Sequence, residues 1–174
     1  MFKYFIFCLA LFSATGASAF RVNSEHAILV SDETGQVLFE KGANVTVPIA
    51  SLTKLLTAMV VLDSKPKMNE QISILPSDVD ALKHSKSHVP VGASLSRKDV
   101  LHLALMSSDN RAAAALARTY AGGPTAFIDA VHQKIKTLGM THTVIQEPTG
   151  LSPENTSTAA DLAKLALAAS RYPE

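Results

Sequence analysis

Two side chains three positions apart, Ser51 and Lys54, are the first candidates for chemistry in this sequence. They begin an apolar stretch, residues 50–63, whose pattern predicts a helix that is buried over most of its circumference. Residues three apart share one helix face, so the hydroxyl and the amine can meet. A lysine that enters apolar surroundings loses solvation, which favours its neutral, proton-accepting form. A serine beside a neutral lysine is an activated nucleophile, and the pair therefore predicts nucleophilic catalysis.

A second polar cluster, Ser108, Asp109 and Asn110, interrupts two helical runs further along the chain. Ser-x-x-Lys and Ser-Asp-Asn belong to one known set of catalytic motifs. A second hydroxyl can relay a proton from Lys54 to a leaving amine, and a carboxamide can hold a substrate amide in line. Each motif is short, so a surface lysine and a solvated turn are the competing interpretations of each one alone. The register 107–109 is an alternative that would place a charge where the carboxamide stands.

The residues around these clusters predict a mixed α+β chain. Apolar runs on either side of the turn residues 32–35 indicate an antiparallel hairpin. Pro48 keeps the backbone extended just before the helix of Ser51, near whose start free N–H groups could polarise a carbonyl. The strands expected are 26–31, 36–40 and 71–74, followed by a loop-rich segment at 76–96. A helix is expected at 97–106, with Ser96 and Asp99 as a cap pair. Two more are expected at 112–120, ended by residues 122–124, and at 125–138, ended by Gly139. A last helix, capped by Ser157 or Thr158, is expected after a turn at 147–150.

Residues 1–19 have the pattern of a secretory signal. Lys3 supplies the positive start, residues 4–12 the apolar core and residues 17–19 a small-residue cleavage site. The apolar run is too short to span a bilayer, so we expect no stable membrane anchor in this chain. Residues 20–174 are then expected to form one partial domain of about 155 residues.

The mature part of the chain would contain no cysteine, because Cys8 lies inside the predicted signal. Disulfides, thiol catalysis and cysteine-bound metals are thereby excluded, and secretion without disulfides favours a bacterial envelope. Without Lys3, basic and acidic residues are equal in number, and no basic block occurs. Nucleic acid is therefore not an expected partner.

A metal site is not expected from the histidines. None of the six forms a His-Glu-x-x-His motif, and His84 and His88 lie in the loop-rich segment without a clear third ligand. We expect surface or packing roles for residues 26, 84, 88, 102, 132 and 142.

Several segments in order resemble a known family. Residues 50–58 and 105–113 are similar to the first two motifs of low-molecular-mass penicillin-binding proteins. Residues 138–140, 147–151 and 157–162 lie where those enzymes carry similar segments. The likeness is greatest to the D-alanyl-D-alanine endopeptidases of the bacterial periplasm, and it extends over the whole mature chain.

The resemblance implies a fold and a mechanism. The fold would be the β-lactamase/penicillin-binding-protein-like transpeptidase fold. Ser51 would attack a peptide carbonyl with Lys54 as general base, Ser108 would pass the proton onward, and Asn110 would orient the substrate. The Ser51 N–H would form half of an oxyanion hole. Peptidoglycan peptides would be the substrates, β-lactams would acylate the same serine as inhibitors, and no cofactor or metal is implied.

The sequence departs from the family in one respect, because its third motif, Lys-Thr-Gly on a strand, is absent. Residues 148–150 lack the lysine and lie in a predicted turn, and residues 136–138 lack the glycine. In the family that strand binds the substrate carboxylate, and its neighbours complete the central sheet. We therefore expect an incomplete fold, with an amino-terminal hairpin and a helical region but without the carboxyl-terminal strands. Apolar faces would stay exposed, and the chain alone could be inactive.

Three functions compete. The first is a serine-type D-Ala-D-Ala endopeptidase or carboxypeptidase that cleaves peptidoglycan crosslinks. The second is a serine β-lactamase, which needs a deacylating glutamate, and Glu147 is a candidate. The third is a non-catalytic fragment or peptidoglycan-binding remnant, suggested by the missing third motif.

Overall fold

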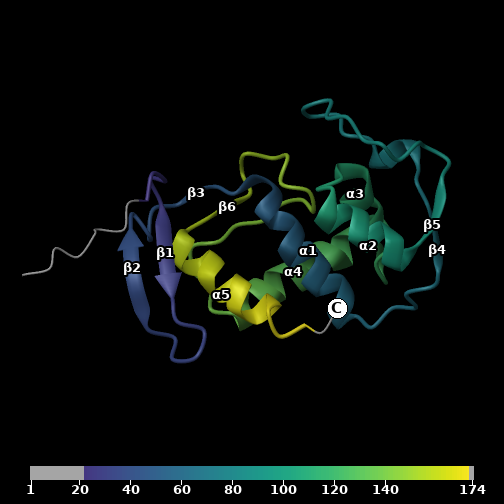
Figure 1. Ribbon diagram of the computed structural model, residues 1–174. Coiled ribbons are helices and arrows are strands. Elements are labelled where there is room, and N and C mark those ends of the chain that lie inside the picture. Colours follow the sequence, from purple (N-terminus) through teal and green to yellow (C-terminus); the bar gives the residue numbers. More distant parts are fainter. Residues whose placement is uncertain (1–21, 173–174) are drawn as a thin grey trace, which may run out of the picture.

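The helix that begins beside Ser51 lies in the middle of the molecule (Figure 1). In the computed structural model, which describes residues 22–172, a single 3-10 turn, η1 (Ala50–Leu52), leads directly into helix α1 (Thr53–Asp63). The helix predicted at 50–63 is thus confirmed, with Ser51 in the tighter first turn. Eight α1 residues are buried: Thr53, Lys54, Leu56, Thr57, Ala58, Met59, Val60 and Val61. The predicted signal segment, residues 1–19, lies outside the described residues.

Four further helices pack against α1, which explains why it has no solvent-facing stripe in its central turns. They are α2 (Arg97–Met106), α3 (Asn110–Arg118), α4 (Gly123–Thr137) and α5 (Ala159–Ala169). The core between them is aliphatic, and Phe127 is its one fully buried aromatic ring among the described residues. No helix in residues 22–172 combines the length and the apolar character needed to cross a bilayer.

The strands of residues 22–172 form three small antiparallel pairs. The predicted amino-terminal hairpin is confirmed as β1 (Ala27–Val30) and β2 (Val37–Lys41), with Leu29 opposite Phe39. Two pairs join segments distant in sequence: β3 (Val47–Pro48) with β6 (Thr156–Ser157), and β4 (Gln71–Ser73) with β5 (Ser94–Ser96). The segment 76–96 was expected to be loop-rich with one helical turn at most, and β5 at its end was not predicted. A single 3-10 turn, η2 (Pro76–Asp78), begins that segment.

Helix starts follow the side-chain caps. The Ser96 hydroxyl accepts a hydrogen bond from the Asp99 N–H, as predicted, and Thr158 caps α5. Asp109 caps α3 by accepting from the Ala112 N–H. Residues 122–124 were expected to end a helix, but they begin α4 instead. Pro124 lies in its first turn, where the missing N–H would have no partner within the helix.

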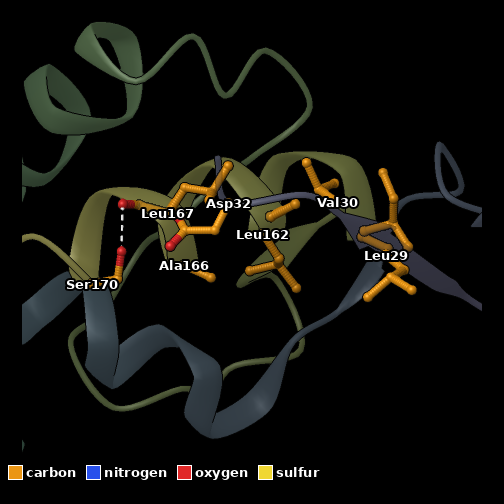
Figure 2. Close-up of a pocket in the computed structure, with 10 residues that line it drawn as sticks. Leu29, Val30, Asp32, Leu162, Ala166, Leu167 and Ser170 are labelled. Atoms are coloured by element: carbon orange, nitrogen blue, oxygen red, sulfur yellow. Dashed lines mark hydrogen bonds between the residues drawn. The ribbon is translucent and has the colours of Figure 1, made fainter. Parts of the chain in front are cut away.

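An apolar groove separates the hairpin from α5 (Figure 2). It measures about 490 Å³, and both of its walls are mainly apolar. Leu29 and Leu38 of the hairpin are 48% and 58% exposed. This groove is an exposed apolar surface of the kind expected for an incomplete α+β fold. Its lining includes Ile28, Leu29, Val30, Leu162, Ala163, Ala166 and Leu167.

The core predicts a large difference between two substitutions. Phe127 is fully buried and meets the Tyr120 ring edge-on at 5.7 Å, so Phe127→Ala should lower the free energy of unfolding by about 3–5 kcal/mol. Met106 is 86% exposed, and Met106→Ala should change it by less than about 0.5 kcal/mol. Urea denaturation measures both. Equal losses would contradict this description of the core.

Candidate active site

Ser51 and Lys54 meet at the start of α1. The Lys54 Nζ lies 3.1 Å from the Ser51 Oγ, at hydrogen-bond distance. Lys54 is only 2% exposed, whereas Ser51 is exposed to solvent. Ala50, just before the serine, has a φ of 46°, a strained conformation that neighbouring contacts must maintain. The site therefore has an accessible hydroxyl backed by a buried amine.

The Lys54 amine has a second partner that fixes its orientation. Its Nζ donates to the Thr149 carbonyl at 2.7 Å. Because a carbonyl oxygen only accepts, one N–H must point toward Thr149. A neutral amine then has its lone pair free to accept the proton of the Ser51 hydroxyl.

The surroundings of Lys54 favour that neutral form. Burial is the largest influence on the Lys54 pKa and lowers it, while the carboxylates of Glu147 and Asp109 raise it in part. The net result is a pKa below the ordinary lysine value. The amine is therefore deprotonated at a lower pH than an exposed lysine, which suits a general base.

The turn at residues 147–150 covers the start of α1. Besides the bond from Lys54, the Pro148 carbonyl accepts a hydrogen bond from the Thr57 hydroxyl at 2.8 Å. Gly150 has a φ of 85°, and a Cβ placed on it would lie 1.8 Å from the Ala50 carbonyl oxygen. Glycine is required here because the turn touches the backbone that leads to Ser51.

Glu147 holds this turn from inside. Its carboxylate accepts from the N–H groups of Thr149 and Gly150 at 2.7 and 2.6 Å. It also accepts from the Asn155 side-chain amide at 2.9 Å, from the Thr149 hydroxyl and, at 3.3 Å, from the Ser152 N–H. Asn155 is fully buried, and its backbone carbonyl accepts a hydrogen bond from the N–H of Ile49. The turn, β6 and the start of α1 are thus one hydrogen-bonded unit.

The second predicted cluster lies in the short connection between α2 and α3. Asn110 donates its amide N–H to the Ser85 hydroxyl at 2.8 Å. Asn110 also lines a hollow of about 210 Å³ together with Glu147 and Thr149, so the structure brings it close to the turn over Lys54. Ser108 is exposed and has a φ of 52°. Within residues 22–172 no hydrogen bond joins its side chain to Ser51 or Lys54.

Several residues that shape this site were not predicted from the sequence. They are the Thr149 carbonyl, Thr57, Asn155 and the turn-holding carboxylate of Glu147. The signals were the turn composition of residues 147–150 and the family resemblance of 147–151, and Glu147 was considered only as a deacylating residue. The described residues contain no group of three His, Cys, Asp or Glu side chains placed to hold a metal ion.

Comparisons with known proteins identify the family of this chain. The model of peptidase family S11, described as D-alanyl-D-alanine carboxypeptidase, matches residues 13–174. The chain is 49% identical to a D-alanyl-D-alanine endopeptidase of Pseudomonas aeruginosa over 150 residues, covering 86% of this chain and 48% of the relative. It is 47% identical to the D-alanyl-D-alanine endopeptidase of Escherichia coli over 161 residues, covering 92% and 52%.

Comparison with solved structures identifies the fold. The Streptomyces K15 DD-transpeptidase superposes with a TM-score of 0.82 at 26% identity, over 90% of this chain and 64% of that one. A D-alanyl-D-alanine carboxypeptidase from Mycobacterium tuberculosis H37Rv superposes with a TM-score of 0.75 at 30% identity, over 90% and 61%. The chain belongs to peptidase family S11, with the penicillin-binding-protein-like α+β fold in partial form. It spans about half the length of the curated relatives it matches.

The contact between the turn and the Ala50–Ser51 peptide predicts a difference between two glycines. Gly92 and Gly150 have similar φ values, 90° and 85°, but a Cβ on Gly92 meets no atom within 4 Å. Gly92→Ala should therefore cost about 1–2 kcal/mol from backbone strain alone. Gly150→Ala should cost more, because the turn must also move away from Ala50. Urea denaturation of both variants measures the difference, and equal costs would show that the turn does not press on this peptide.

Proposed function

We propose that this chain carries the nucleophile and general base of a serine-type D-Ala-D-Ala peptidase, which hydrolyses the peptide crosslinks of peptidoglycan. The observation that carries the proposal is the buried Lys54 amine, held between the Ser51 hydroxyl at 3.1 Å and the Thr149 carbonyl at 2.7 Å. The relatives at 49% and 47% identity are named endopeptidases, so we favour cleavage of crosslinks over removal of a terminal residue.

The proposed reaction proceeds through an acyl-enzyme. Lys54 takes the proton of the Ser51 hydroxyl as Oγ forms a bond to the peptide carbonyl carbon. The carbon–nitrogen bond then breaks, and the proton passes to the leaving amine by way of the Ser108 hydroxyl. Water, with its proton taken by the same base, hydrolyses the ester and restores Ser51. Asn110 orients the substrate amide.

Localisation and inhibition follow from the same proposal. The signal predicted at residues 1–19 would direct the protein across the inner membrane to the bacterial periplasm, where peptidoglycan is its substrate. β-Lactams present a carbonyl to Ser51 in place of the peptide and would inhibit by acylating it. The family's Lys-Thr-Gly motif does not occur in the 174 residues, so binding of the substrate carboxylate is not assigned to this chain.

The geometry of Glu147 argues against the β-lactamase alternative. A deacylating carboxylate must hold a water molecule against the ester. Both Glu147 oxygens instead accept hydrogen bonds from the turn and from Asn155. We therefore expect a long-lived acyl-enzyme with β-lactams.

The proposal predicts a stable penicillin adduct on Ser51. Intact-mass spectrometry of the folded chain incubated with penicillin should show one added penicillin, and Ser51→Ala should abolish it. A folded chain that forms no adduct would support the third alternative, a non-catalytic fragment. Rapid loss of the adduct, with turnover of a chromogenic cephalosporin, would support the β-lactamase.

Neighbouring serines supply a matched control for the proton relay. Ser108→Ala should slow adduct formation by about 10²–10⁴-fold, the usual contribution of a general acid–base group. Ser107 is also exposed, and Ser107→Ala should leave the rate unchanged. The reverse result would show that the register 107–109 is the functional one.

A further inference from the structure

One peptide group connects Glu147 to Lys54. The Gly150 N–H donates to the Glu147 carboxylate at 2.6 Å, and the Thr149 carbonyl accepts from the Lys54 amine at 2.7 Å. These two groups belong to the same peptide unit, and none of the described peptide bonds is cis, so they point in opposite directions. The carboxylate and the amine therefore bind the two ends of one planar dipole.

This arrangement both fixes and polarises the acceptor of Lys54. A negative charge on the N–H side repels electron density toward the carbonyl oxygen, and linked hydrogen bonds strengthen one another. The carbonyl cannot rotate away from the amine without breaking the hydrogen bond from the Gly150 N–H to the carboxylate, because the two groups share one rigid peptide. The Thr149 N–H and hydroxyl are bound to the same carboxylate and hold the residue before that peptide.

We infer that Glu147 is a positioning residue for Lys54, which it holds in orientation toward Ser51 through the Thr149–Gly150 peptide. This inference rests on the proposed function, because orientation of the amine matters if Lys54 is the base. It assigns Glu147 a role distinct from that of a deacylating base, since the carboxylate reaches Lys54 through backbone atoms.

Charge gives the inference a measurable consequence. Among the described residues, the carboxylates that act on Lys54 are Glu147 from the turn and Asp109 from the cap of α3, and both oppose the lowering of its pKa by burial. Without the charge of Glu147, only Asp109 opposes the lowering of the Lys54 pKa by burial. The Lys54 pKa should then fall further, so the amine loses its proton at a lower pH than in the unmodified chain.

The test is an NMR titration of the Lys54 side chain, identified by the signal that Lys54→Met removes. Glu147→Gln keeps one accepting oxygen but loses the charge, and it should shift the Lys54 titration to lower pH. Glu154→Gln makes the same chemical change at an exposed residue of the same loop and should leave the titration in place. A Lys54 midpoint that is unchanged or higher in Glu147→Gln would overturn the inference.

A second measurement needs no variant at Glu147, so it remains available if Glu147→Gln fails to fold. In the unmodified chain the Gly150 amide signal should move with the Lys54 titration and with the same midpoint, because one peptide unit connects them. A Gly150 signal that ignores this titration would also overturn the inference.

Separate outcomes test the proposed function and the role of Glu147. If the unmodified chain forms no penicillin adduct but Glu147→Gln lowers the Lys54 midpoint, the proposed function fails and the link between Glu147 and Lys54 stands. If the adduct forms and the midpoint does not fall, only the role of Glu147 is lost.

Discussion

Burial of the Lys54 amine is the constraint on which the rest of the site depends. An amine that is 2% exposed must have hydrogen-bond partners inside the protein, because water cannot reach it. One partner, Ser51, lies on the preceding helical turn. The other, Thr149, lies 95 positions away in sequence. The chain must therefore return to the start of α1, and residues 147–157 make this return.

Backbone pairing and side-chain hydrogen bonds together bring the chain back to the start of α1. Strands β3 and β6 pair just before α1, and the Ile49 N–H donates to the Asn155 carbonyl at 3.0 Å. Asn155 is connected to Glu147 by hydrogen bonds, and Glu147 holds the turn. Because each contact depends on the next, a change at Glu147 acts on Lys54 through the turn, whereas a side chain at Gly150 would press directly on the Ala50–Ser51 peptide.

The amino-terminal hairpin exposes apolar side chains where the sheet is incomplete. The β1–β2 hairpin forms a two-stranded sheet in the described part of the chain, and α5 covers it only in part, leaving the apolar groove of Figure 2. A two-stranded hairpin is marginal by itself, so the contacts between α5 and β1 matter for its stability. This groove agrees with the coverage of the relatives, of which the chain spans about half.

Local sequence signals predicted the elements that depend on local physics. The hairpin follows from turn residues between apolar runs, α1 from its apolar composition, and the start of α2 from the Ser96 cap. The meeting of Ser51 and Lys54 follows from helix spacing alone.

Strand β5, the β3–β6 pair and the Thr149 partner of Lys54 were missed, because each depends on contacts between segments far apart in the sequence. Two-residue strands such as Val47–Pro48 carry no periodicity, and their pairing depends on segments far away in sequence. The Thr149 carbonyl is a backbone atom that every residue possesses, so no side-chain pattern marks it. Glu147 was named only as a candidate deacylating residue. Its hydrogen bonds to the turn exist only in the folded chain, so its role in holding the turn was not predicted.

The most direct test of the central claim is the rate of penicillin adduct formation as a function of pH in the folded, unmodified chain. If the buried Lys54 amine is the base, the rate should rise with pH and level off below the ordinary lysine pKa of 10.5. A rate that continues to rise through that value, as it would with an exposed lysine, would contradict the account.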